Sequence, residues 1–287
     1  MSTLRNLFVS LALLLTMTAA VANAKSADPI IVHPDVRRML MDQKAFIEGA
    51  RAFTYWTALH GDLQEKSPDE KVREKAEDYM GLMTPVVKAY LTHKGFESAN
   101  LGLQVHGGSG FTREWGMEQY VRDCRISLIY EGTNGIQALD LVGRKLPAKG
   151  GKALRGYLKL VGSFISQNKD NEALAPMMAK LSDALTDLQD ATTWLMSNAM
   201  TKPDNAGAAS VPYLHLMALV MFGHMWGQIA KAALAGIAAG DGDIAFYEHK
   251  LTTANYFFTH MLAETAVHKA RVGAGAQSMM ALAAEAF

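Results

Sequence analysis

The sequence predicts an all-α protein. Apolar residues recur at the spacing of amphipathic helices along most of the chain, and no alternating apolar and polar run bounded by turns indicates a strand. Breaks rich in glycine, proline and polar residues separate these stretches and suggest two consecutive helical bundles. We place the linker at residues 145–152, where Pro147 and Gly150 interrupt the pattern, and expect the bundles at 25–146 and 147–287.

The composition excludes several classes of protein. The chain has 287 residues, 49% of them apolar, so it can bury a substantial core, and a disordered or fibrous protein is set aside. Lysine plus arginine and aspartate plus glutamate number 28 each, so no net field would attract nucleic acid. Cys124 is the single cysteine, which excludes an internal disulfide and a cysteine-rich zinc site.

The first 24 residues have the features of a secretory signal peptide. Arg5 supplies a positive start, residues 7–21 are apolar, and Ala-Asn-Ala at 22–24 fits a cleavage site. The apolar run is short for a membrane span and polar Lys25 follows it, so we expect no stable membrane anchor. A cleaved signal would indicate a periplasmic or secreted protein. The alternative is a core helix, or a start foreign to the ancestral domain.

Two long helices should open the first bundle. The first, 34–59, begins with a proline, which suits this position because its missing N–H would be unpaired there anyway. The second, 67–94, should start with a capping box formed by Ser67 and Glu70. Pro85 removes one backbone hydrogen bond inside it, so we expect a bend there.

The remaining helices are separated by glycine-rich breaks. Residues 95–113 indicate a loop or a short helix with a tight turn at 107–110, and helical spacing resumes at 117–128. The last two helices should be antiparallel, because only the short segment 240–243 joins them. The helices expected in the second bundle are 153–168, 173–200, 211–239 and 243–271.

The residues most informative about function lie between Gln104 and Leu146. The segment QVHGGSGF, 104–111, places small residues where a backbone could approach a ligand closely. Glycine content alone is more typical of a tight turn between helices. The segment is not the dinucleotide-binding fingerprint, because it follows a helix rather than a strand.

Glu131 stands among apolar neighbours, directly before a glycine and the expected start of a helix. Burial raises the pKa of a carboxyl group toward the range useful for proton abstraction, so a buried glutamate here could act as a base. A negative charge favoured by the dipole at a helix start is the alternative. From this residue alone the second explanation is the simpler one.

Together these motifs resemble the C-terminal helical domain of the acyl-CoA dehydrogenase family. The order glutamine, HGG-x-GF, RE, EQY-x-RD-x-RI and IYEGTNGIQA, between Gln104 and Ala138, carries the resemblance. The segment ADPIIVHPDVRRML, 27–40, and the region after residue 146 look like the longer branch of the family, that of 3-methylmercaptopropionyl-CoA dehydrogenase-type members. The resemblance therefore implies a family-type helical bundle followed by a second helical bundle.

The resemblance also implies an oxidoreductase of fatty acid metabolism that uses FAD and an acyl-CoA substrate. Glu131 would remove the α-proton of the thioester while a hydride leaves the β-carbon for FAD, giving the trans-2-enoyl-CoA. The backbone N–H of Glu131 and a flavin hydroxyl would polarise the thioester carbonyl. Gly132 would let the substrate lie against the backbone, and Thr133 would touch FAD.

Further flavin contacts follow from the resemblance. Those from a neighbouring subunit are expected at Gln104, Gly107 and Gly108, so the resemblance implies a homo-oligomer. His33 and Val36 match other flavin-proximal positions. Family membership also implies a cytoplasmic location, which conflicts with the signal-like start.

Full members of the family place an N-terminal helical domain and a middle β-domain before this region, and the sequence contains neither. Those domains supply much of the acyl pocket and one wall of the flavin site. We therefore expect a truncated form that binds FAD weakly and turns over little or no acyl-CoA alone. The alternative is a non-catalytic helical interaction module derived from an acyl-CoA dehydrogenase.

Five histidines of the second bundle raise the question of a metal site. Neither an H-E-x-x-H motif nor a cysteine–histidine set supports one, so we assign no metal. Methionines and aromatic residues at helical spacing in this bundle are more typical of a core than of a cofactor site. The histidines are His215, His224, His249, His260 and His268.

Overall fold

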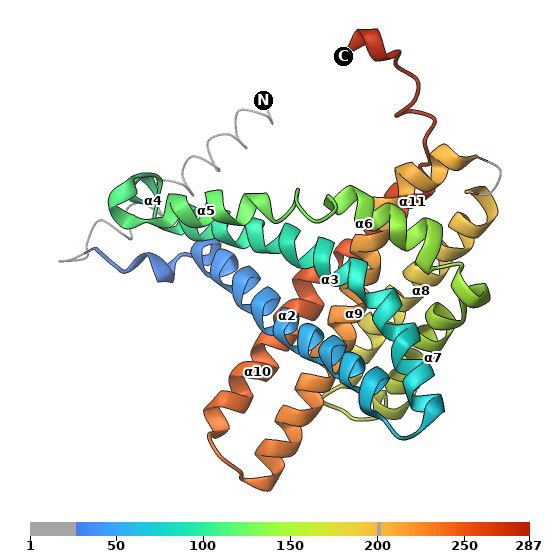
Figure 1. Ribbon diagram of the computed structural model, residues 1–287. Coiled ribbons are helices and arrows are strands. Elements are labelled where there is room, and N and C mark those ends of the chain that lie inside the picture. The colour runs from blue at the N-terminus through green and yellow to red at the C-terminus, as the bar shows by residue number, and fades with distance from the viewer. Residues whose placement is uncertain (1–26, 200–201) are drawn as a thin grey trace, which may run out of the picture. The chain divides into compact units, whose positions relative to one another are not determined.

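The computed structural model describes residues 27–199 and 202–287 (Figure 1). The predicted signal peptide, 1–24, lies outside the described residues. All regular structure in the described part is helical, and no strand occurs there, which confirms the all-α prediction. Close approaches between backbone segments divide the chain into two units, Met1–Met39 and Leu40–Phe287.

In the first unit, Met1–Met39, the described residues form a short 3-10 helix and the start of a long α-helix. The 3-10 helix η1 is Ile30–Val32 and the α-helix α2 is Pro34–Lys66, which begins at its proline as predicted. Arg37 Nε donates to the carbonyl of Ile31 at 2.8 Å, which ties η1 to the first turn of α2.

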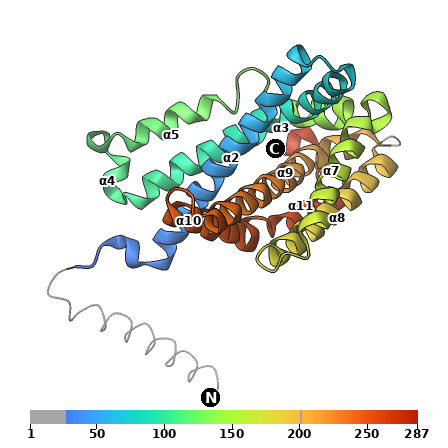
Figure 2. The same cartoon turned by 90° about the horizontal axis from the view of Figure 1, so that it is seen from below.

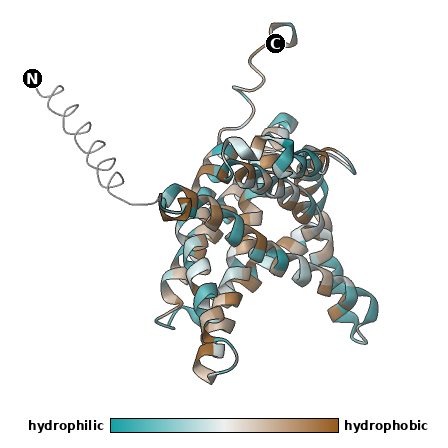
Figure 3. Cartoon of the chain, turned by 90° about the vertical axis from the view of Figure 1, so that its left-hand side faces the viewer, coloured by the Kyte–Doolittle hydropathy of each residue, from teal (hydrophilic) through white to brown (hydrophobic). Residues whose placement is uncertain are grey.

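In the second unit, long helices pack around a common apolar core. Its first long helix after α2 is α3, Glu70–Val105, and α5, Met117–Ile126, lies along α3 (Figure 2). In Figure 3, apolar and polar residues share most helices, as expected of amphipathic helices. The other elements are α4 (Gly108–Phe111), η2 (Arg113–Trp115), α6 (Asn134–Asp140), η3 (Leu141–Lys145), η4 (Ala148–Gly151), α7 (Lys152–Asn168), α8 (Ala175–Asn198), α9 (Pro203–Ala239), α10 (Ile244–Tyr256), η5 (Phe257–Met261), α11 (Glu264–Gly273) and η6 (Ala284–Ala286).

The helices α2 and α3 are longer than predicted. Both continue through a glycine, Gly61 in α2 and Gly95 in α3, although glycine was expected to end or loosen the helix. A helical glycine costs only about 1 kcal/mol relative to alanine, which packing along a long helix can offset.

The residue that caps α3 also differs from the prediction. Asp69, not Ser67, is the N-cap, and its carboxylate accepts from the backbone N–H of Lys71 at 2.9 Å. Ser67 instead accepts from the N–H of Asp69 at 3.3 Å, one step before the helix. Aspartate is as good an N-cap as serine, and Asp69 directly precedes Glu70, the first residue of α3. Pro85 lies inside α3 and is buried.

The core of the second unit is centred on α9, which packs against α3, α6, α8, α10 and α11. Trp226 is fully buried and donates from Nε1 to the carbonyl of Ala45 in α2 at 3.2 Å. Phe222 stacks between Phe46 and Phe257, with ring centroids 6.1 and 6.4 Å away. The methionines of α9 are buried in the same core, which confirms that they pack rather than line a site; they are Met217, Met221 and Met225.

One helix in the described part of the chain, α9, is long and apolar enough to cross a membrane. Within its most apolar stretch, 67% of the residues are buried inside the protein. Burial of this kind is what the central helix of a helical core requires.

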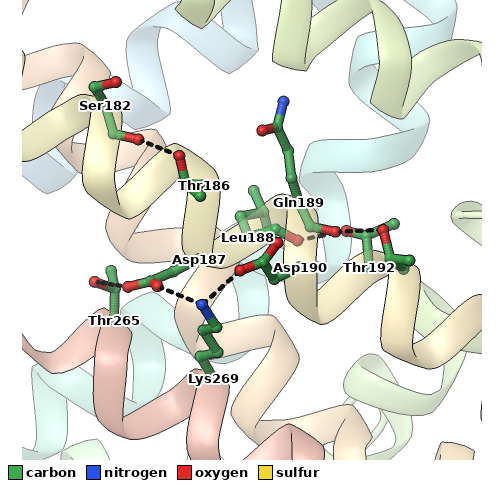
Figure 4. A network of polar contacts seen from close by, with 10 residues as sticks. Ser182, Thr186, Asp187, Leu188, Gln189, Asp190, Thr192, Thr265 and Lys269 are labelled. Carbon is green, nitrogen blue, oxygen red and sulfur yellow. Dashed lines mark hydrogen bonds and ion pairs between the residues drawn. The ribbon is translucent and has the colours of Figure 1, made fainter.

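A polar network joins α8 to α11 at the edge of this core (Figure 4). Lys269 Nζ lies 3.2 Å from a carboxylate oxygen of Asp187 and 2.6 Å from one of Asp190. Thr265 Oγ1 donates to the other oxygen of Asp187 at 3.1 Å. Partly exposed ion pairs contribute roughly 0 to 1 kcal/mol each, so the network orients α11 against α8 more than it stabilises the fold.

His224 of α9 is buried in the core, with 3% of its surface exposed. Its Nδ1 lies 3.3 Å from Tyr157 Oη, and its Nε2 lies 3.2 Å from Gln228 Nε2. Burial lowers the pKa of His224 to about 4, because the charged imidazolium would lose its hydration.

Two glycines of α9 should respond oppositely to alanine. A Cβ at Gly227 would lie 2.7 Å from the ring of Phe164, so Gly227→Ala should lower the free energy of unfolding by about 1 to 3 kcal/mol. A Cβ at Gly207 would meet nothing within 4 Å, so Gly207→Ala should raise it by roughly 0.5 to 1 kcal/mol. Urea denaturation of both variants measures the difference, and equal shifts would contradict this packing.

Stability should also fall in acid through His224. Its folded pKa lies below the unfolded value of about 6.5, so its contribution is complete above pH 6.5 and is lost as the pH falls toward 4. At pH 5 the loss should be about 2 kcal/mol, and His224→Gln should remove that part of the pH dependence. Denaturation at pH 7 and pH 5 tests this, with His249→Gln, an exposed site on α10, as control.

Candidate active site

The turn that carries Glu131 connects α5 to α6. The N–H of Asn134 donates to the carbonyl of Leu128 at 3.1 Å and closes the loop. Thr133 is the N-cap of α6, and its hydroxyl accepts from the N–H of Ile136 at 3.4 Å. The predicted helix therefore starts where the sequence indicated, with the glutamate two residues before its cap.

The backbone of this turn takes an uncommon conformation. Glu131 has φ 53° and Gly132 has φ 82°, so two consecutive residues lie in the left-handed region. For a residue with a side chain this costs on the order of 1 kcal/mol, and among the described residues only Lys149 shares it. The positive φ of Gly132 favours glycine, and a Cβ there would also lie 2.9 Å from Gln137 Nε2 and displace the end of that side chain.

Side chains hold both carbonyl groups of the turn. Gln137 Nε2 donates to the carbonyl of Glu131 at 3.3 Å, and Lys88 Nζ donates to that of Gly132 at 2.6 Å. In contrast, the backbone N–H groups of Glu131, Gly132 and Thr133 donate to no other atom of the described chain. Fixed N–H donors of this kind can stabilise an oxygen on which negative charge develops.

The carboxylate of Glu131 is exposed to solvent. Its apolar neighbours Ile129 and Tyr130 are also exposed, with 48% and 50% of their surfaces accessible. The burial that would favour a base at this position is therefore not provided by the described chain. The helices α3 and α6 support the turn from one side, and its other side is open.

The HGG turn, His106-Gly107-Gly108, lies where α3 ends and α4 begins. Gly107 has φ 60°, a backbone conformation that favours glycine. At Gly110 a Cβ would clash with the carbonyl of Leu103, so packing requires glycine there. Neither reason applies to Gly108, where a Cβ would meet nothing within 4 Å. Gln104 is exposed on the last turn of α3.

The structure does not bring the two turns together within one chain. Lys88, beside the Glu131 turn, and Val105, beside the HGG turn, are separated along α3 by a rise of about 25 Å. In Figure 1, α4 and α6 accordingly lie at opposite ends of α5. His33 and Val36, the other predicted positions, lie at the start of α2 in the first unit.

An open apolar groove of about 970 Å³ runs between α3 and α5, next to the HGG turn. Several of its apolar side chains are exposed, including Phe111 at 79%, Ile126 at 55% and Ile129 at 48%. The groove was not predicted from the sequence. Its signal was the spacing of Ile126, the last residue of α5, and Ile129, three residues further on, beside a helix that has charged residues elsewhere.

Two of the five histidines considered for a metal lie near each other. His215 is flanked by His93 and His268, with ring centroids 4.8 and 5.3 Å away, at a cavity of about 520 Å³ between α3, α9 and α11. Burial lowers the pKa of His215 to about 3 and that of His268 to about 4. Within 27–199 and 202–287, no three metal-binding side chains are arranged to hold an ion.

Comparison with known sequences identifies relatives over most of the chain. A family model described as acyl-CoA dehydrogenase, C-terminal domain, matches residues 4–146, and one described as acetyl-CoA dehydrogenase C-terminal like matches 157–283. A 3-methylmercaptopropionyl-CoA dehydrogenase of Ruegeria pomeroyi is 38% identical over 251 residues, 87% of this chain and 42% of its own length. A butyryl-CoA dehydrogenase of Syntrophomonas wolfei is 33% identical over 258 residues, 86% of this chain and 42% of its own length.

Solved structures show the same fold. Caenorhabditis elegans ACDH-11, solved in complex with C11-CoA, aligns with a TM-score of 0.67 at 18% identity and covers 83% of this chain and 38% of its own. An acyl-CoA dehydrogenase of Bacillus anthracis, complexed with FAD, aligns with a TM-score of 0.66 at 20% identity, over 89% of this chain and 44% of its own. The chain thus spans about two fifths of the length of its curated relatives. The two family models together match most of the chain, and with these relatives they show that the chain belongs to the acyl-CoA dehydrogenase family.

Proposed function

We propose that this chain takes part in FAD-dependent dehydrogenation of an acyl-CoA thioester to the trans-2-enoyl-CoA, with Glu131 as the base. The observation that carries the proposal is the turn itself, which sets a carboxylate beside backbone N–H groups that have no acceptor among the described residues. Relatives named as acyl-CoA dehydrogenases, over most of this chain, support the substrate class.

The described residues fit FAD at two places. At the HGG turn, the backbone of Gly107 and Gly108 is open, and a Cβ at either would meet nothing within 4 Å, so a ligand can lie against it. At the other turn, the hydroxyl of Thr133 is exposed beside Glu131. FAD, when bound, supplies the acceptor for the hydride that leaves the β-carbon.

The residues of the turn divide the remaining work. The carboxylate of Glu131 accepts the α-proton, and the N–H of Glu131 donates to the thioester carbonyl as negative charge develops on its oxygen. Gly132 keeps the backbone free of a side chain where the thioester lies. Because Glu131 is exposed, water stabilises its charged form and weakens it as a base, so turnover by this chain alone should be low.

We also propose a homo-oligomer in which each copy completes the site of another. The HGG turn and the Glu131 turn stand at opposite ends of the 25 Å of α3 between them, so one reaction centre with both turns nearby draws them from different copies. The apolar groove beside the HGG turn supplies a surface that a second copy can cover.

A second candidate function is a helical interaction module without catalysis. The same groove favours it, because exposed apolar side chains mark binding surfaces whether or not a reaction takes place nearby. The two functions differ in whether the chain binds FAD and in whether acyl-CoA turnover depends on Glu131.

Flavin binding and dye reduction test the first function. The purified full chain should bind added FAD weakly, seen as quenching of flavin fluorescence, and should reduce dye slowly with butyryl-CoA. Glu131→Gln should lower that rate at least about a hundredfold and leave FAD affinity unchanged, because the base acts on the substrate.

The matched control is Glu172→Gln, an exposed glutamate between α7 and α8. Equal rates in the two variants would exclude Glu131 as the base. No FAD binding by a correctly folded chain would favour the interaction module. Stoichiometric flavin in the purified protein, with ready reduction by butyryl-CoA, would contradict the expected weak binding.

The groove predicts the oligomer interface. Ile126→Asp should raise the dissociation constant of the oligomer at least about tenfold, because a charge would be buried in an apolar contact. Met196→Asp, on the last turns of α8, is the control, since Met196 is also exposed, at 61%, but lies outside the groove. Analytical ultracentrifugation measures both, and equal behaviour of the two variants would reject this interface.

A further inference from the structure

The Glu131 turn is held by one face of α3. Lys88 Nζ donates to the carbonyl of Gly132 at 2.6 Å and to Asn134 Oδ1 at 3.0 Å. These contacts cross more than 40 residues of sequence, so they belong to the tertiary fold rather than to the turn itself.

Asn134 completes the attachment. Its Oδ1 also accepts from Thr92 Oγ1 at 3.1 Å, and its Nδ2 donates to the carbonyl of Ala89 at 3.1 Å. Both ends of the amide are therefore bound by residues on one face of α3. An amide with donor and acceptor both satisfied fixes the start of α6 in position and in rotation.

Lys88 makes these contacts through its ammonium group. Its hydrogen bonds in the described chain go to two amide oxygens, the carbonyl of Gly132 and the side-chain oxygen of Asn134. Burial lowers its pKa, while the negative charge of Glu131 acts in the opposite direction. Partial burial and the charge of Glu131 thus act in opposite directions on the same ammonium group.

Two successive peptide groups of the Glu131 turn are held by side chains. Lys88 fixes the peptide between Gly132 and Thr133, and Gln137 fixes the peptide between Glu131 and Gly132. Both peptides are held by their oxygens, which opposes relaxation of the left-handed conformation of Glu131 and Gly132.

We propose that Lys88 is a positioning residue for Glu131: its ammonium holds the turn so that the carboxylate and the free N–H groups keep their places. The inference rests on the proposed function for its chemical meaning. The hydrogen bonds from Lys88 to the turn need neither flavin nor turnover, so their effect can be measured in the purified chain.

Hydrogen exchange and lysine titration test the proposal. In Lys88→Met, backbone amides of residues 129–136 should exchange about tenfold faster, because a charged hydrogen bond to the turn is lost. Lys88→Arg should keep most of the protection, since its guanidinium can also donate to both oxygens. By NMR of the lysine side chain, Glu131→Gln should lower the pKa of Lys88, which a contact unrelated to Glu131 would not do.

The matched control is Lys71→Met, at the exposed start of α3, which should leave the exchange of 129–136 unchanged. Wild-type exchange in Lys88→Met with helix content intact would overturn the proposal. So would an unchanged pKa of Lys88 in Glu131→Gln. Since neither readout needs FAD or acyl-CoA, failure of the proposed function would be seen separately, in the dye assay.

Discussion

Because α9 carries buried side chains on nearly all its faces between Tyr213 and Gly227, the neighbouring helices must cover it, and this requirement sets their places. The ring of Tyr90 in α3 packs on Phe222 of α9, with centroids 5.2 Å apart. Residues 88–92, which include Tyr90, lie where α3 packs on α9. The Glu131 turn attaches to α3 at those residues and continues into α6, which also packs on α9, so its place derives from the core through these two helices.

The site that results is rigid in its backbone and open to solvent. A strained turn persists only where its surroundings hold it, and here the hold comes from Gln137 within α6 and from Lys88 across the fold. What is absent from the described residues is a cover over the carboxylate of Glu131. Preorganised donors and a solvated base are together consistent with a surface that works only when another surface closes on it.

The sequence predicted the helical class, most helices and the start of a helix just after Glu131, because helical spacing and helix-start residues are local signals. It failed where distant packing decides. The helices continue through Gly61 and Gly95, since tertiary contacts outweigh a weak local preference. The role of Lys88 was also invisible, because its partners lie 44 and 46 residues away, and the exposure of Glu131 depends on what covers it rather than on its neighbours.

The length of α3 between its two functional ends has a consequence for how such a protein would behave on dilution. If the Glu131 turn belongs to the reaction centre of its own copy and the HGG turn to that of a neighbouring copy, an isolated copy contains no complete reaction centre, however well it folds. Specific activity would then depend on protein concentration, rising as copies meet. Mixing a variant changed at the HGG turn with a variant changed at the Glu131 turn would also regenerate a complete reaction centre, although each variant alone is inactive.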